Sequence, residues 1–390
     1  MSIRTQRSLP FCSRILNELI ENGLVAESGL AESTGGRRAH TYALVQDAMY
    51  IVAVAMDQLV TRIAILNMLN RELGETRVVA LSLYDNREAL PMLIKNIENH
   101  ILGLGISKSS IIGIGIGMPG FVDVVKGVNH SFLPMPEGSS IVSRLEKETG
   151  IPVYIDNDSS LIALAESRFG LAKEKKNALV INVGWGIGLG IIVNRELFRG
   201  NNGFAGEFSH IPLFTNNKMC SCGKTGCLET ETSLLVVAER LIRELEDGKI
   251  SSLKLDELSL LYPEATSQKI IAAATRGDRL AIEKITEAAY YIGKGAAILI
   301  HLFNPELIIL SGRGASAGRL WITPIQQAVH EHAIPKIAEN TEIRISRLQY
   351  QAEIIGAAAL VMEHFGKDNN SKIFEKKRSI PDEPDIAITA

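Results

Sequence analysis

The sequence has 390 residues, of which 46% are hydrophobic and 22% are charged, which predicts a soluble folded protein of two or three domains. Its net charge of −3 excludes a global attraction to nucleic acid, so any DNA contact must come from a local patch. The N-terminus lacks an apolar signal core and no apolar run approaches the length of a membrane span, which predicts a cytoplasmic protein without membrane contact.

Residues 1–46 differ in character from the rest and predict a small N-terminal domain. Apolar residues recur with a helical period from Leu9 to Asn22, and Gly23 provides a stop signal. The stretch that follows predicts two short strands joined by a glycine turn, with Arg37 and Arg38 just beyond the turn. A helix followed by a two-stranded wing resembles the later part of a winged helix-turn-helix.

In this interpretation, polar side chains near Ser13 and Arg14 on the recognition helix face the major groove of DNA, and Arg37 and Arg38 form a basic wing tip. The sequence starts where the second helix of such a domain would lie, so we expect the first helix to be absent. The remaining helical core would bury less apolar area. A small dimerisation or packing subdomain is an open alternative for the same pattern.

From Met49 onward, short strands rich in β-branched residues alternate with helices, which predicts an α/β architecture. The pattern predicts strands at 50–56, 61–67, 76–84, 111–117, 153–156, 178–184 and 307–310, and helices at about 87–104, 159–169 and 353–365. Residues 367–390 are polar, charged and contain proline, which predicts a disordered tail.

Three of the four cysteines lie close together in the loop from Gly203 to Glu229. Cys220, Cys222 and Cys227, with His210 from the preceding turn, offer one imidazole and three thiolates, a closed tetrahedral set suited to structural zinc. Such a zinc has no open position at which to activate water, so it would hold the loop in place. Free thiols packed in a loop are the alternative.

Five segments together resemble the ROK family of repressors, open reading frames and sugar kinases. They are GIGIGMPGFVD, IDNDSSLIALAESRFG, NVGWGIGLGIIVNRELFRG, GFAGEFSH and CSCGKTGCLE, and their order, spacing and residue types agree with the family. The resemblance covers roughly residues 47–366 and implies an actin-like, ribonuclease H-like fold of two lobes with a sugar in the cleft between them. It implies a first lobe from 47–155 plus 354–366 and a second lobe from 156–353.

The resemblance implies sugar contacts at Gly120, Asn157, Asp158, Glu207, His210 and Glu229. Asp158 matches the general base of the family's kinases, where a carboxylate deprotonates a sugar hydroxyl. The pattern alone favours Asp158 as the N-cap of the helix that follows, whereas the resemblance favours a sugar contact. The zinc loop would turn Glu207 and Glu229 toward the sugar, whose hydroxyls donate to carboxylates, although plain surface charge explains either glutamate as well.

The first nucleotide-binding element that the resemblance implies is altered. Where kinases of the family read Asp-x-Gly-Gly-Thr, the sequence has Asp57, Leu59, Val60 and Thr61, and both glycines are replaced. Glycines in such a turn let backbone N–H groups approach a phosphate, and larger side chains obstruct that approach.

Two further elements are altered in the same way. Trp185, between Gly184 and Gly186, replaces a threonine whose hydroxyl would contact phosphate, and the glycine run fits a plain hairpin turn equally well. The turn around Gly312 has lost one of two glycines. Three altered elements predict weak or absent ATP binding.

These features favour a transcriptional regulator, most simply a repressor, that responds to a hexose, an amino sugar or a phosphorylated sugar. It would carry structural zinc, bind operator DNA and form a homodimer or homotetramer. An ATP-dependent sugar kinase with Asp158 as its general base is the alternative. A sugar sensor that no longer binds DNA is the third hypothesis.

Overall fold

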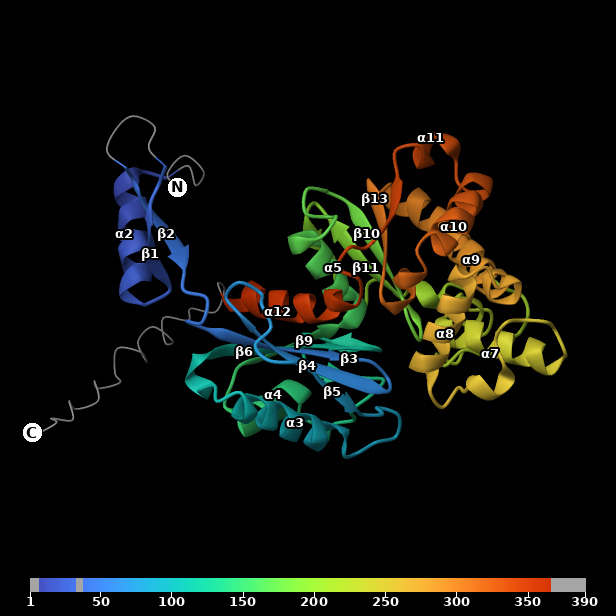
Figure 1. Cartoon of the computed structure of the whole chain (residues 1–390), viewed down its shortest axis with the longest axis horizontal. Coiled ribbons are helices and arrows are strands. Elements are labelled where there is room, and N and C mark those ends of the chain that lie inside the picture. Colours follow the sequence, from blue (N-terminus) through green and yellow to red (C-terminus); the bar gives the residue numbers. More distant parts are fainter. Residues whose placement is uncertain (1–6, 33–37, 366–390) are drawn as a thin grey trace, which may run out of the picture.

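The computed structural model describes residues 7–32 and 38–365, so Arg37 and the predicted tail over 367–390 lie outside the described residues. Figure 1 shows two lobes side by side, with a small N-terminal unit set apart from both. Within the described ranges, no helix is both long enough and apolar enough to cross a bilayer.

The helices are α2 (Leu9–Glu21), α3 (Ala89–Gly103), α4 (Ile141–Thr149), α5 (Asp158–Phe169), α6 (Glu229–Thr232), α7 (Leu234–Glu246), α8 (Pro263–Thr275), α9 (Arg279–Phe303), α10 (Arg319–His332), α11 (Pro335–Ala338) and α12 (Ala352–Phe365). The 3-10 helices are η1 (Lys108–Ser110), η2 (Phe208–His210), η3 (Leu255–Glu257), η4 (Arg313–Ala317) and η5 (Gln349–Gln351).

The strands are β1 (Val25–Leu30), β2 (His40–Leu44), β3 (Tyr50–Met56), β4 (Val60–Asn67), β5 (Arg77–Ala80), β6 (Ile111–Met118), β7 (Val122–Asp123), β8 (Val128–Asn129), β9 (Val153–Asn157), β10 (Ala178–Val183), β11 (Ile187–Val193), β12 (Glu196–Leu197), β13 (Leu307–Ser311) and β14 (Glu342–Ile345). The predicted strand over 76–84 is shorter than expected and ends at Ala80. Beyond it, the amides of Leu81 and Leu83 bond the turn between β3 and β4 instead.

The first lobe is built on a sheet with strand order β5-β4-β3-β6-β9. Side chains alternate across β3, so Val52 and Val54 join the core under α3 and α4, while Ile51 and Ala53 join the core under α12. Figure 1 shows α12 on one face of this sheet and α3 and α4 on the other. The sheet extends through Asn157, at the start of α5.

The second lobe is built on a sheet with strand order β12-β11-β10-β13-β14, in which β10 and β11 form an antiparallel hairpin and β13 and β14 run parallel to β10. The helices α7 to α10 supply most of the core on one face. Helix α5 joins the two lobes, because Leu161 and Leu164 pack with α12 and Ile162 and Ala165 pack with β10. This position explains why α5 is apolar on several sides.

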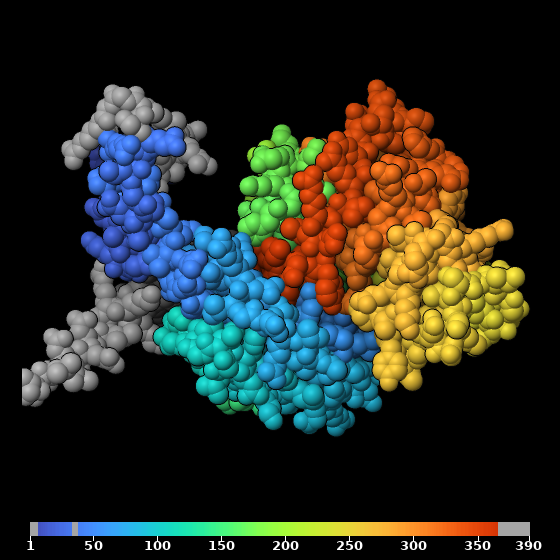
Figure 2. Space-filling model, viewed as in Figure 1, coloured from blue at the N-terminus to red at the C-terminus, as the bar shows by residue number. Residues whose placement is uncertain are grey.

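Within residues 7–32 and 38–46, the N-terminal unit contains α2 and the antiparallel pair β1 and β2, in agreement with the predicted helix and two-stranded wing. Residues 1–6, on which the expected absence of a first helix depends, lie outside the described residues. Leu24 packs with Met49 in the core of the first lobe, which anchors the unit. Part of the apolar side of α2 is exposed, since Leu9 keeps 70% and Phe11 keeps 41% of its surface. Figure 2 shows this unit projecting from the two lobes.

Candidate functional site

A cleft of about 580 Å³ lies between the lobes, where the ends of β3, β6, β9 and β10 meet. Such crevices beyond the carboxyl ends of strands are where α/β proteins bind ligands. Most of the predicted site residues line it: Asp57, Gly120, Asn157, Asp158, Gly184, Trp185, Gly186, Glu207, His210 and Glu229, together with the metal-set residue Cys222. Leu59, Val60, Thr61 and Gly312 do not line the cleft itself.

The start of α5 positions Asn157 and Asp158. The side-chain oxygen of Asn157 accepts from the backbone N–H of Ser159 at 2.9 Å and of Ser160 at 3.3 Å, so Asn157 is the N-cap. Its amide nitrogen donates to the carbonyl of Gly120 at 3.1 Å. The alternative in which Asp158 caps the helix is therefore wrong, because Asp158 is the first helical residue and lines the cleft.

The carboxylate of Asp158 lies in an unusual environment. One oxygen accepts from the backbone N–H of Ser159 at 2.7 Å, and Asn182 donates to the other at 3.4 Å. Burial, and then the charge of Glu353, raise the pKa of Asp158 to about 7. A carboxylate of this kind can bind a sugar hydroxyl or take its proton near neutral pH.

Gly120 occupies a turn that only glycine fits. Its φ is 85°, and a Cβ atom there would lie 2.5 Å from the Cβ of Ser131. Asn129 holds this turn in place by donating to the carbonyl of Pro119 at 2.9 Å. Its oxygen accepts from the backbone N–H of Ser131 at 2.9 Å, so its side chain is engaged in the turn.

Aromatic residues that the sequence analysis did not identify form part of the cleft wall. Phe121, which lines the cleft, lies with its ring centroid 6.0 Å from Phe204 and 6.1 Å from the His210 ring. Their positions in the sequence could have indicated this role, because Phe121 directly follows Gly120 and Phe204 lies within the GFAGEFSH segment. Flat apolar faces are typical of sites that bind the C–H surfaces of small ligands.

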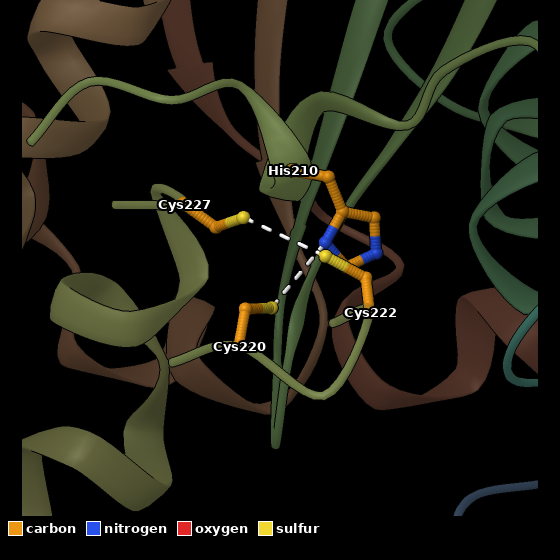
Figure 3. A group of neighbouring side chains, drawn as sticks. All are labelled: His210, Cys220, Cys222 and Cys227. Carbon is orange, nitrogen blue, oxygen red and sulfur yellow. Dashed lines mark hydrogen bonds between the residues drawn. The ribbon is translucent and has the colours of Figure 1, made fainter. Parts of the chain in front are cut away.

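The four predicted metal ligands converge, and Figure 3 shows their side chains facing one another. Their ligand atoms all lie within 4.8 Å of each other. The Sγ of Cys220 is 3.6 Å from Nδ1 of His210, and the Sγ atoms of Cys222 and Cys227 are 3.7 Å apart. Tetrahedral zinc with Zn–S bonds of about 2.3 Å requires about 3.8 Å between sulfurs and about 3.6 Å between sulfur and nitrogen. The residues fit a structural zinc ion.

The metal set also orients the two predicted glutamates. With Nδ1 of His210 directed at the cysteines, its Nε2 lies 3.6 Å from the carboxylate of Glu207. Glu229 begins α6, directly after the metal loop, and accepts from the backbone N–H of Ile187 at 3.3 Å. Burial raises the pKa of both glutamates, to about 7 for Glu207, where the charge of Glu229 adds to the effect. The two carboxylates therefore share one side of the cleft.

In the altered phosphate loops, backbone N–H groups form hydrogen bonds within the same loop. In the turn between β3 and β4, one oxygen of Asp57 accepts from the backbone N–H groups of Leu59 and Val60, both at 2.7 Å. In the hairpin between β10 and β11, the N–H of Gly184 donates to the carbonyl of Gly186 at 2.9 Å. The N–H groups that cradle phosphate in glycine-rich turns are used internally here.

Arg313, which the sequence placed in an altered turn without assigning it a role, lies between these loops. Its guanidinium pairs with the carboxylates of Asp57 and Glu264, and lies 4.5 Å from the ring of Trp185 and 4.9 Å from that of Tyr350. Trp185, which stands where the family has threonine, and Arg313, which lies in the turn that has lost a glycine, thus contact one another. No spacing rule relates positions so distant in the chain.

The predicted DNA-contacting residues lie far from the cleft on the N-terminal unit. Ser13 and Arg14 are exposed on α2, and Arg38 is exposed before β2, while Arg37 lies outside the described residues. The side chain of Arg14 keeps 67% of its surface and lies 4.0 Å from Glu18, one helical turn away.

Two curated relatives match different shares of the chain. The chain is 31% identical to the xylose repressor of Caldicellulosiruptor bescii over 359 residues, which covers 90% of this chain and 87% of that protein. It is 36% identical to the glucokinase of Halalkalibacterium halodurans over 273 residues, which covers 68% of this chain and 81% of that protein.

A solved ROK family transcriptional regulator, a homolog of the E. coli MLC protein, superposes with a TM-score of 0.79 at 26% identity, covering 96% of this chain and 93% of that chain. The ROK family model itself matches residues 65–364. The matched stretch contains the cleft residues from Gly120 onward and the whole metal set, and the actin-like fold agrees with it. The chain belongs to the ROK family.

Proposed function

We propose that this protein is a transcriptional repressor whose affinity for operator DNA changes when a sugar binds in the cleft. One observation carries the proposal. The match to the xylose repressor covers 90% of the chain, which is more than residues 47–390 supply, so it extends into the N-terminal segment. The glucokinase match covers 68% and needs no part of that segment.

The cleft would supply the sensing half of this function. Asp158, Glu207 and Glu229 would offer acceptors for sugar hydroxyls beside the capping residue Asn157. The zinc held by His210 and the cysteines would keep the loop with both glutamates in position. Zinc would supply a rigid brace here, because four protein ligands leave it no open position. Coupling to DNA requires that the sugar bind two conformations of the protein with unequal affinity.

The N-terminal unit would supply the DNA-binding half. Exposed Ser13 and Arg14 on α2 and Arg38 beside β2 would contact the duplex, with α2 in the major groove. A symmetric dimer would suit a paired operator site, and the protein would act in the cytoplasm.

A mobility-shift titration with the protein's own promoter region tests this proposal. We expect Arg14→Ala and Arg38→Ala each to weaken DNA binding about tenfold. Each should also reduce the slope of log affinity against log salt concentration by about one. Arg144→Ala is a matched control, because Arg144 is also an exposed helical arginine that lies 3.2 Å from a glutamate one turn away. Absence of any shift at low salt, with and without sugars, would sink the proposal.

A sugar kinase remains a second candidate, favoured by one observation. Asp158 lines the cleft with its pKa raised to about 7, as suits a general base. Transfer of labelled phosphate from ATP to any sugar, lost in Asp158→Asn, would establish this function in place of the one we propose. We expect no transfer above background.

A further inference from the structure

We infer that the cleft takes an unphosphorylated sugar and discriminates against sugar phosphates. The inference rests on the proposed function, which leaves the charge of the sugar open. Three features of the cleft lead to it: the balance of charged side chains, the contacts of its one guanidinium, and the bonding of its backbone N–H groups.

The charged side chains that line the cleft are mainly acidic. Five carboxylates border it, and they belong to Asp57, Asp158, Glu207, Glu229 and Glu353. Among the described residues of its lining there is one arginine, Arg313, and no lysine. Phosphate carries close to two negative charges near neutral pH, so a lining with more carboxylates than cations disfavours it even where Asp158 and Glu207 are partly protonated. The hydroxyls of a neutral sugar, by contrast, donate readily to carboxylates.

The guanidinium of Arg313 is already paired at both of its terminal nitrogens. Its Nη1 pairs with Glu264, its Nη2 pairs with Asp57, and the Tyr350 hydroxyl lies 3.3 Å from Nη2. Trp185 and Tyr350 contact its faces, and its side chain keeps only 10% of its surface. An arginine that recognises phosphate presents a free fork of N–H groups, and here that fork is held by two carboxylates.

Backbone N–H groups of the altered loops beside the cleft are also bonded within the protein. The N–H groups of Leu59 and Val60 donate to Asp57, and that of Ile187 donates to Glu229 at 3.3 Å. Anion-binding turns need several free N–H groups that point at one place. The charges of Glu353 and Asp57 also raise the pKa of Asp158, which indicates that negative charge already accumulates at this end of the cleft.

Titration calorimetry with matched pairs of ligands tests the inference. The panel contains xylose, glucose, N-acetylglucosamine and N-acetylmannosamine, each beside its terminal phosphate ester. We expect at least one parent sugar to bind and its ester to bind at least tenfold more weakly. An ester that binds as tightly as its parent, or that binds alone, would overturn the inference.

The same titrations separate this inference from the proposed function. If a parent sugar binds selectively but leaves operator binding unchanged, the proposed function fails and the inference stands. If operator DNA is released only by a sugar phosphate, the function stands and the inference fails. If neither ligand class binds, both fail.

Releasing Arg313 tests its part in the selectivity. Glu264→Gln removes one of its carboxylate partners from a half-exposed position on α8. We expect this variant to bind the phosphate ester about fivefold more tightly than the unchanged protein does, with parent-sugar affinity within twofold. Glu257→Gln, a charge removal on η3 outside the cleft lining, is the control and should change neither. If Glu264→Gln binds the ester no better, the role assigned to Arg313 is wrong.

Discussion

At the scale of single residues, Asp158 shows how the cleft alters side-chain chemistry. Its carboxylate accepts from the backbone N–H of Ser159, which favours the charged form, yet burial and the charge of Glu353 outweigh that bond. The result is a pKa of about 7, well above the ordinary value of 3.8. Ionising such a group lowers the stability of the folded protein. A carboxylate with a raised pKa that faces a cleft is a candidate functional group.

A pH-dependent stability difference follows from this shift. The folded protein keeps the Asp158 proton between about pH 4 and pH 7, whereas the unfolded chain has lost it, so stability falls as pH rises through this window. We expect Asp158→Asn to raise Tm by about 2 °C or more at pH 8, which corresponds to about 1 kcal/mol, and to have little effect at pH 4.5. Thermal unfolding at both pH values measures this. A Tm difference that does not vary with pH would refute the shift.

At the scale of elements, the metal loop links the two predicted glutamates to the cleft wall. We expect purified protein to contain about one zinc per chain. Cys222→Ser should lose the metal and lower Tm by about 5 °C or more, because ligand loss removes binding energy that stabilises the folded loop. Ser221→Ala, in the same loop, is the matched control and should change Tm by less than about 1 °C. Metal content well below one per chain would contradict the zinc assignment.

The close packing of α12 on β6 leads to a second prediction, about stability. A Cβ atom on Gly115 would lie 1.9 Å from the carbonyl oxygen of Ala357, so the helix packs directly on the glycine backbone. We expect Gly115→Ala to destabilise the protein by about 2 kcal/mol or more, measured by denaturant unfolding. Gly103→Ala, at the end of α3 with open space around it, should be neutral or stabilising. Equal effects of the two substitutions would show that this packing is looser than described.

Much of the fold could be predicted from sequence because its strands carry strong local signals. The β-branched alternation of β3 and the apolar run of β6 locate both strands to within a residue. The predicted strand over 76–84 is too long, because the chain leaves the strand after Ala80. Leu81 and Leu83 are still buried, but their backbone N–H groups donate to the turn between β3 and β4. Apolar spacing alone does not distinguish these two kinds of burial.

The candidate site was predictable where ligands lie close together in the sequence. Cys220, Cys222 and Cys227 fall in one loop, so their spacing revealed the metal set. The contacts of Arg313 were not predictable, because Asp57 and Glu264 come from distant segments and many exposed carboxylates are equally good partners by sequence. Which charges meet is decided only when the lobes pack.

At the scale of the whole molecule, the cleft and the candidate DNA-binding residues lie far apart. The cleft lies between the lobes, whereas Arg14 and Arg38 lie on a unit that projects from them and is anchored through Leu24 and Met49. Helix α5 contacts the cores of both lobes and carries Asp158 at its first position. A sugar bound at Asp158 would therefore act on the element that joins the lobes.

The most direct test of this coupling is sugar affinity measured by calorimetry with and without saturating operator DNA. Linkage requires that DNA weaken sugar binding by the same factor by which sugar weakens DNA binding. We expect both factors to agree and to be about fivefold or more, which corresponds to about 1 kcal/mol. If sugar and DNA both bind but the sugar Kd is the same with and without DNA, the protein is not a sugar-responsive repressor.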